Sequence, residues 1–297
     1  MNSQKVVLIT GSSSGFGRVI AETLARKGYR VFASMRDSNS KNAARRDELL
    51  QLAGSEKLSL SVVDLDVTDE RSVERAVTEV IADEGRIDVL INNAGYALWG
   101  LTEAFTIEQA QRIFDTNFFG VVRMNRSVLP HMRRQHSGLI IHVSSGAGRG
   151  VFPGMGLYTA TKFALEALAE CYRYELSQQG VDSISLEPGP FATEIFGKSE
   201  AAADGGRSAE YGETAKVPQF IFSAIESSAV PVQEVADEVA KLIETPAGQR
   251  PMRTLIGPIV GALQPINDTA GQIQREILTS MGLEHLLTVT SAKSEAA

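Results

Sequence analysis

Short runs of β-branched residues alternate with longer amphipathic stretches from Val6 to about residue 256. Such an alternation is typical of strand–helix–strand crossovers, which build a parallel sheet with helices on both faces. Strands are predicted at residues 6–10, 31–34, 58–63, 89–91, 139–143, 183–186 and 253–256. Helical stretches separate them, near residues 15–27, 41–53, 69–84, 106–135, 157–179 and 231–244. The sequence therefore predicts an α/β fold with a doubly wound, seven-stranded parallel sheet.

The chain has 297 residues and shows neither a linker nor a repeat, so we expect one domain over residues 1–297. The alternation fails between Pro188 and Pro231, and a loop this long usually has a function. Its apolar residues follow no sustained period; they are Ile195, Phe196, Tyr211, Phe220, Ile221 and Phe222. The C-terminal extension, about residues 258–297, contains one helical candidate at 268–278 and a polar end that we expect to be frayed.

The charge balance narrows the possible partners and the compartment. Lys and Arg total 29 against 36 Asp and Glu, a net charge of −7, which is the wrong sign for a protein that mainly binds nucleic acid. No apolar run approaches the ~20 residues of a membrane helix, so we expect no membrane partner. The single cysteine, Cys171, excludes an internal disulfide and a cysteine-rich metal site. We therefore expect a cytoplasmic protein without a metal.

Three glycines lie between the first predicted strand and the helix that follows, in Gly11-Ser12-Ser13-Ser14-Gly15-Phe16-Gly17. Backbone N–H groups at such a turn are unpaired, and a diphosphate can accept their hydrogen bonds if no side chain blocks its approach. The spacing differs from the G-x-G-x-x-G dinucleotide fingerprint, and a tight turn without a ligand is the alternative. We assign a dinucleotide to this turn, held by Gly11, Ser13, Ser14, Gly15, Phe16 and Gly17.

The same segment matches the G-x-S-x-G nucleophile elbow of α/β-hydrolases, with Ser13 as the nucleophile. Such an elbow normally lies further into the sheet, and it needs an acid and then a histidine downstream. None of the four histidines lies in a sequence context that indicates a catalytic role; they are His131, His136, His142 and His285. We therefore favour the dinucleotide over the hydrolase.

The end of the second strand bears on the choice of cofactor. NAD-binding folds carry a carboxylate there that binds the ribose hydroxyls, whereas this chain has Met35 followed by Arg36. No carboxylate at this position would repel a 2′-phosphate, and the Arg36 guanidinium could clamp one. We therefore expect NADP(H); the alternative is a solvated Arg36 with Asp37 as the acidic residue.

Tyr158 and Lys162 lie four residues apart at the start of a predicted helix, so they share one face. A free phenol ionises near pH ~10, and a neighbouring cation favours the phenolate and lowers its pKa. The pair is therefore a candidate acid/base, although the same spacing also occurs as an ordinary surface pair.

The position of this pair makes the catalytic interpretation stronger. Ser145 follows the fifth strand and Asn93, Ala94 and Gly95 follow the fourth, and ligands of open parallel sheets bind beyond the carboxyl ends of strands. The start of the Tyr158 helix should lie at the same edge. Ala94 and Gly95 are small enough to let the backbone approach a cofactor.

Taken together, these residues identify the chain as resembling a single-domain short-chain dehydrogenase/reductase over about residues 5–256. The matching motifs occur in order: Thr10-Gly-x-x-x-Gly-x-Gly17, Asp66-Val67, Asn92-Asn-Ala-Gly95, Asn117, Ser145, Tyr158-x-x-x-Lys162 and Pro188-Gly189. The resemblance implies a Rossmann-like fold and hydride transfer with a nicotinamide cofactor. The long segment after Thr193 and the late strand resemble the hydroxysteroid and retinol dehydrogenase branch.

The resemblance also implies roles for individual residues. Tyr158 would exchange a proton with the substrate oxygen, Ser145 would hydrogen-bond that oxygen, and Lys162 would lower the pKa of Tyr158 and bind the nicotinamide ribose. Asn117 would anchor a water that relays the proton. The remaining cofactor contacts would come from Asp66 and Val67 at the adenine, Asn93, Ala94 and Gly95 in the cofactor wall, and Pro188, Gly189 and Thr193 near the carboxamide.

The segment at about residues 190–230 occupies the place of the family's substrate lid. Its apolar side chains could line a pocket for an apolar ketone, aldehyde or secondary alcohol, or could simply pack the lid against the sheet. Val151, Phe152, Met155, Leu157 and Trp99 are further candidates for the lining. A nonenzymatic NADP(H)-binding regulator remains the alternative function. Family members associate through the helices near 106–135 and 157–179, so a homodimer or homotetramer is expected.

Overall fold

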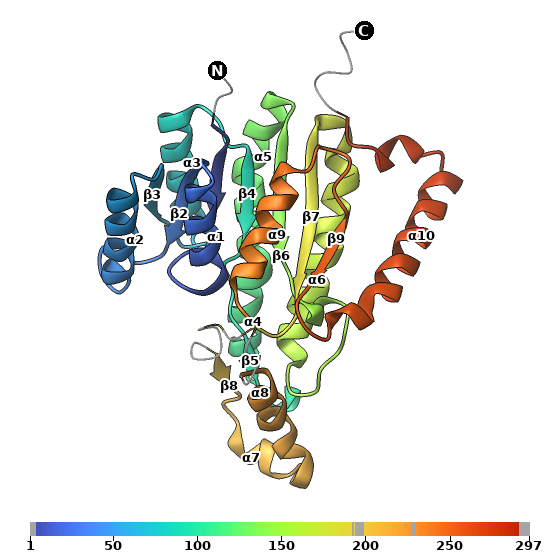
Figure 1. The fold of residues 1–297 in the computed structure, drawn as a ribbon. Helices are drawn as coiled ribbons and strands as arrows, with labels where there is room; N and C mark the ends of the chain where they lie inside the picture. Colours follow the sequence, from blue (N-terminus) through green and yellow to red (C-terminus); the bar gives the residue numbers. More distant parts are fainter. Residues whose placement is uncertain (1–3, 192, 194–198, 227–229, 291–297) are drawn as a thin grey trace.

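The computed structural model describes residues 4–191, 193, 199–226 and 230–290. Seven parallel strands form the central sheet in the order β3-β2-β1-β4-β6-β7-β9 (Figure 1). Their bounds are β1 Val6–Ile9, β2 Arg30–Met35, β3 Leu60–Asp64, β4 Val89–Asn92, β6 Gly138–Val143, β7 Val181–Pro188 and β9 Arg253–Ile256. The predicted doubly wound sheet is confirmed.

Helices cover both faces of the sheet, which explains why most strands are continuous apolar runs. On one face, α1 (Gly15–Arg26), α2 (Ala43–Glu56) and α9 (Gln233–Glu244) pack on side chains such as Val7 and Ile9. On the other face, α3 (Glu70–Glu84), α5 (Gly120–Gln135) and α6 (Gly156–Leu176) pack on side chains such as Leu8 and Leu90. The order of strands reverses between β1 and β4, and the edge beyond that point is where ligands bind in such sheets.

The helix expected at 106–135 has a wide turn in its middle. It consists of α4 (Ile107–Phe114), the π-helical segment η2 (Asp115–Phe119) and α5. A Thr106–Gln109 capping box begins α4. Asn117 lies in the π-helical turn, and such turns are frequent at functional sites.

The segment expected to be irregular contains short elements. These are β8 (Glu200–Ala201), α7 (Gly205–Ala209), η5 (Gly212–Lys216) and α8 (Val217–Glu226). β8 pairs in parallel with β5 (Leu98–Trp99), and this small lobe lies beyond the carboxyl ends of the large sheet (Figure 1). These short elements have no sustained hydrophobic period that would predict them. Helix α8 contains Pro218 in its first turn, where proline is tolerated.

The C-terminal extension forms η6 (Val260–Leu263), α10 (Gln264–Ser280) and η7 (Glu284–Leu287). Helix α10 is longer than the predicted 268–278 and stands at the outer side of β9 (Figure 1). Among the described residues, no helix combines the length and apolarity that crossing a bilayer requires.

Candidate active site

A cavity of about 900 Å³ lies at the carboxyl edge of the sheet. Its walls come from the segments that follow β1, β2, β3, β4, β6 and β7, together with the start of α6. Most of the predicted site residues line it: Ser13, Ser14, Gly15, Phe16, Arg36, Asp66, Val67, Asn93, Ala94, Gly95, Ser145, Tyr158, Lys162, Pro188, Gly189 and Thr193. Gly11, Gly17 and Asn117 lie just behind this wall.

The glycine turn between β1 and α1 needs its glycines for different reasons. Gly11 and Gly15 have φ angles of +71° and +57°, a region that favours glycine. A Cβ at Gly17 would lie 2.4 Å from the Gly11 carbonyl oxygen, so Gly17 allows the helix to pack on the turn. Among the described residues, a Cβ at Gly15 would meet only Thr193, at 3.7 Å, which is an ordinary van der Waals contact. This turn is therefore a cradle that a side chain at position 15 would partly fill.

Asn93 and Thr10 hold the turn against the segment after β4. The Asn93 Nδ2 donates to the carbonyl oxygens of Thr10 and Gly11, at 2.9 and 3.0 Å. The Thr10 Oγ1 accepts from the backbone N–H groups of Asn93 and Ala94, both at 3.0 Å. The predicted wall residues thus lie beside the glycine turn, and Asn93 acts on it directly.

The far end of the cavity holds cationic and polar groups. Met35 is buried, whereas Arg36 is exposed and lines the cavity together with Lys41 and Asn42. Asp66 turns its carboxylate onto its own loop, because Oδ1 accepts from the backbone N–H and the hydroxyl of Thr68, at 2.9 and 2.7 Å. Cationic and polar side chains therefore gather at this end of the cavity.

Tyr158 and Lys162 lie together at the start of α6, as their spacing predicted. Both side chains are buried, and the Lys162 Nζ lies 5.7 Å from the centroid of the Tyr158 ring. The Nζ also donates to the Val143 carbonyl oxygen at 2.8 Å, which fixes the ammonium at the end of β6. The pair therefore has the placement of an acid/base beside a cofactor cleft.

The pKa of Tyr158 differs from the sequence-based expectation. Burial raises the pKa of the phenol, and the hydrogen bond with Ser145 lowers it by less. Lys162, whose own pKa burial lowers to about 8, does not produce the expected depression. The reason is that a desolvated phenolate is costly, and the ammonium is engaged by Val143 rather than by the phenol.

Ser145 begins the short 3-10 turn η3 (Gly146–Gly148) directly after β6. Its Oγ accepts from the Ala147 backbone N–H at 3.1 Å and interacts with the Tyr158 hydroxyl. The preceding residue, Ser144, also lines the cavity. The interaction with Tyr158 distinguishes Ser145 from Ser144 as the partner of the phenol.

Asn117 lies behind the cavity with only 2% of its surface exposed. Its Nδ2 donates to the Tyr96 carbonyl at 3.0 Å and to Thr161 Oγ1 at 3.2 Å, and its Oδ1 accepts from the Tyr96 N–H at 3.1 Å. Both amide hydrogens are therefore in use, and a relay water could bind only to the remaining lone pair of Oδ1. Asn117 links the segment after β4 to α6.

The segment after β7 forms the opposite wall. Pro188 and Gly189 line the cavity, and a Cβ at Gly189 would lie 2.4 Å from the Pro258 carbonyl oxygen. Phe191 packs edge-to-face on Phe16 of the glycine turn, with 5.5 Å between ring centroids. This contact joins the segment after β7 to the glycine turn.

The apolar lining differs from the prediction. Phe152, Met155 and Trp99 line the cavity, but Val151 is 75% exposed and Leu157 packs with the neighbouring core. Of the lid residues, Tyr211 and Phe220 are exposed, while Ile221 and Phe222 pack beneath the lobe, where Phe222 contacts Trp99 edge-to-face at 5.2 Å. Ile195 and Phe196 lie outside the described residues. These four lid side chains therefore pack against the core or face solvent, whereas Thr193 and Glu200 of the same segment line the cavity.

Several lining residues were missed by the sequence analysis, notably Tyr96, Arg112, Ile259 and Val260. Tyr96 follows the Asn92–Gly95 motif directly, so its place could have been inferred. Ile259 and Val260 belong to the C-terminal extension, and Ile259 adopts a φ of +60°, which is unusual for a β-branched residue. Nothing in their local sequence indicates the cavity.

Two of the four histidines have partners of their own, which argues against a hydrolase triad with Ser13. His142 is fully buried, burial lowers its pKa to about 3, and its Nε2 lies 3.2 Å from Ser183 Oγ. His131 pairs with Arg134 at 2.9 Å. These partners leave neither histidine available to activate Ser13.

Comparison with known proteins agrees with this geometry. The family model for short chain dehydrogenases matches residues 5–204. A 3-ketodihydrosphingosine reductase from Bacteroides thetaiotaomicron is 33% identical over 259 residues, which is 87% of this chain and 90% of the relative. Retinol dehydrogenase 8 from Homo sapiens is 40% identical over 199 residues, which is 65% of this chain and 61% of the relative.

Solved structures share the fold over most of the chain. A short-chain dehydrogenase from Streptomyces avermitilis is 30% identical with a TM-score of 0.75, covering 95% of this chain and 98% of the other. An alcohol dehydrogenase from the archaeon Thermococcus sibiricus, complexed with 5-hydroxy-NADP, is 25% identical with a TM-score of 0.71, covering 87% and 98%. The chain therefore belongs to the short-chain dehydrogenase family and is an oxidoreductase with a nucleotide-binding fold.

Proposed function

We propose that the protein transfers a hydride between NADP(H) and the carbonyl or carbinol carbon of an apolar ketone, aldehyde or secondary alcohol. The observation that carries this proposal is the convergence of Ser145, Tyr158 and Lys162 with the glycine turn on one cavity. An acid/base pair next to a dinucleotide cradle is the arrangement that hydride transfer to a carbonyl requires.

The described residues fit a nicotinamide dinucleotide. Gly15 lines the cavity and carries no side chain, so a diphosphate could approach the turn at the start of α1. Arg36 would bind the 2′-phosphate that distinguishes NADP(H) from NAD(H), and Asp66 and Val67 would flank the adenine. The nicotinamide half would be held by Asn93, Ala94, Gly95, Pro188, Gly189, Thr193 and Lys162.

When bound, the reduced cofactor supplies the hydride. Ser145 would hydrogen-bond the substrate oxygen, and Tyr158 would donate its proton as negative charge develops there. The raised pKa of Tyr158 favours its protonated form, which is the form that reduction needs. Lys162 would hold the nicotinamide ribose, and Asn117 would anchor a water that relays the proton.

The apolar side of the cavity supports an apolar substrate. Trp99, Phe152, Met155 and Val260 line it beside the Ser145–Tyr158 pair. The lid at about residues 190–230 would close over this side. The names of the two relatives suggest two compounds for a first panel, 3-ketodihydrosphingosine with NADPH and retinol with NADP⁺.

The experiment measures oxidation of NADPH by the purified protein with a panel of ketones and aldehydes. Tyr158→Phe should lower kcat by about 100-fold to 1,000-fold, because it removes one donor to the developing oxyanion. Tyr174→Phe is the matched control, since Tyr174 lies on the same helix but donates to Glu170 at 2.9 Å. Tight NADPH binding without turnover of any carbonyl would instead favour the nonenzymatic regulator, and Ser13-dependent ester cleavage would favour the hydrolase.

We also infer a cytoplasmic homodimer or homotetramer. Exposed apolar side chains on the helices expected to associate support this assembly, namely Ile107 on α4, Phe119 in η2 and Phe163 on α6. The lone Cys171, which is exposed, fits a reducing compartment.

A further inference from the structure

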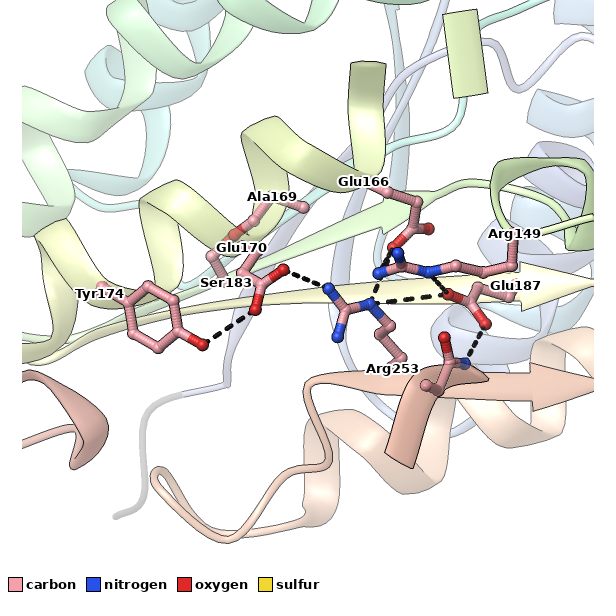
Figure 2. Close-up of polar contacts among 9 residues, drawn as sticks. Arg149, Glu166, Ala169, Glu170, Tyr174, Ser183, Glu187 and Arg253 are labelled. Atoms are coloured by element: carbon pink, nitrogen blue, oxygen red, sulfur yellow. Dashed lines mark hydrogen bonds and ion pairs between the residues drawn. The ribbon is translucent and has the colours of Figure 1, made fainter. Parts of the chain in front are cut away.

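A buried cluster of charges lies against α6, one helical turn beyond Lys162 (Figure 2). Arg149 contacts Glu166 at 3.5 Å and Glu187 at 3.4 Å. Arg253 contacts Glu166 at 3.3 Å and Glu187 at 3.9 Å, and it also binds Glu170. The side chains of Glu166 and Glu187 are only 2% and 0% exposed. These five residues, the charge cluster, are not explained by the motifs of the family.

Each member of the charge cluster comes from an element that also shapes the cavity. Arg149 lies four residues after Ser145, and Glu187 directly precedes Pro188. Arg253 belongs to β9, which leads into Ile259 and Val260. In Figure 2 the side chains from these elements point toward one another between α6 and the sheet. The cluster therefore joins the segments that form the site.

Glu166 connects this cluster to the acid/base pair. Tyr158, Lys162 and Glu166 are spaced by four residues, so they lie along one face of α6. A Cβ at Gly148 would lie 2.9 Å from Glu166 Cγ and 3.3 Å from the Lys162 carbonyl oxygen, so the Ser145 loop packs closely on both. The Glu166 Oε1 is buried and has no hydrogen-bond partner in the described part of the chain. The guanidiniums of Arg149 and Arg253 donate to the other oxygen, Oε2, at 3.5 and 3.3 Å.

The buried ammonium of Lys162 requires a nearby negative charge to stay protonated. The Lys162 side chain is buried, and within the described part of the chain its ammonium donates to the neutral Val143 carbonyl. A buried ammonium without a compensating carboxylate tends to lose its proton. Burial lowers the pKa of Lys162, and the negative charge of Glu166 raises it.

The other ionisable groups around Lys162 cannot replace Glu166. His142 on β6 stays neutral because burial and the charge of Lys162 lower its pKa to about 3. Tyr158 stays protonated because burial raises its pKa. Arg149 and Arg253 are cations, and Glu187 and Glu170 contact those cations. Burial and the charge of Glu166 raise the pKa of Glu187 to about 7, so Glu187 is partly protonated near neutral pH and carries less negative charge than Glu166.

We propose that Glu166, held by Arg149 and Arg253, is a positioning residue that keeps the Lys162 ammonium charged beside Tyr158. The proposal rests on the proposed function, in which Lys162 binds the nicotinamide ribose. A structural role alone is a weaker explanation, because buried ion pairs add little net stability over apolar packing.

The test follows NADPH affinity, by fluorescence titration, and kcat/KM from neutral to alkaline pH. Glu166→Gln keeps the shape and removes the charge, so the pH at which both quantities decline should fall by about one unit or more. Glu166→Asp should restore most of the original profile. Glu170→Gln is the matched control: it removes a carboxylate of the same cluster, one turn further along α6, and should leave the alkaline decline in place.

Arg149→Met is a second test variant, for which we expect the pH of the alkaline decline to move in the opposite direction. It removes a cation that offsets Glu166, so the alkaline decline should move to higher pH. If Glu166→Gln does not fold, this variant alone decides. An unshifted profile in either folded variant, while the wild type binds NADPH, overturns the proposal.

The two readouts separate this proposal from the proposed function. A wild type that binds NADPH but reduces no carbonyl would defeat the proposed function, while the pH dependence of binding would still test Glu166. A wild type that does not bind NADPH would defeat both.

Discussion

The same substitution, glycine to alanine, can be made inside the candidate cofactor site at Gly15 and outside it at Gly28. Both have a positive φ, +57° and +88°, and none of the residues that the structure describes would clash with a Cβ at either position. Alanine at either position should therefore cost about 1–2 kcal/mol of backbone strain, partly offset by about 0.4–1 kcal/mol from the stiffer unfolded chain. Gly15 lines the cavity, and Gly28 follows the far end of α1. Only Gly15→Ala places a methyl group where the diphosphate would approach.

Thermal unfolding and NADPH titration together measure the two effects. Gly15→Ala and Gly28→Ala should each lower Tm by no more than about 4 °C. Loss of one backbone hydrogen bond to a charged phosphate costs about 1.5–3 kcal/mol, so Gly15→Ala should raise the Kd for NADPH by about 10-fold to 150-fold. Gly28→Ala should leave that Kd unchanged. Equal NADPH affinities in the two variants would refute the assignment of the turn as the diphosphate cradle.

Two further predictions concern charge. Arg36→Ala should raise KM for NADPH by about 10-fold or more, because it removes a charged partner of the 2′-phosphate, while KM for NADH changes little; a parallel change for both cofactors would contradict that role. Glu187 has a pKa raised by burial from 4.5 to about 7, so its contribution to stability is complete below pH 4.5 and is lost as the pH rises through about 7. Urea unfolding at several pH values should therefore show that Glu187→Gln lacks this decline, and an identical decline in both proteins would rule it out.

The strands could be predicted because a buried parallel strand is a short apolar run. The predicted strand at 253–256 coincides with β9, whereas β7 extends beyond the predicted 183–186 to include Glu187 and Pro188. A charged residue followed by proline normally ends a strand. Here Glu187 pairs with Leu255 and Pro188 with Ile256, so β7 continues because β9 lies beside it. That pairing is a tertiary effect without a local signal.

The π-helical turn at Asn117 shows a second limit of local patterns. The helix at 106–135 is amphipathic throughout, and one widened turn changes neither composition nor period enough to be detected. Asn117 was found only through the resemblance to a family. Its hydrogen bonds to Tyr96 and Thr161 give the structural reason for its position.

The candidate site was largely predictable because its residues follow strands, and parallel strands end at one edge of the sheet. The charge cluster is assembled in the same way, yet Arg149, Glu166, Glu187 and Arg253 look like unrelated surface charges in the sequence. They meet because β6, β7 and β9 are neighbours and α6 covers them. Removing one partner of a buried pair costs about 3–5 kcal/mol because it leaves the other charge uncompensated, so a change in one member of the cluster affects the others. Because the same elements carry Ser145, Lys162 and Pro188, a shift in the cluster must also move the walls of the cavity.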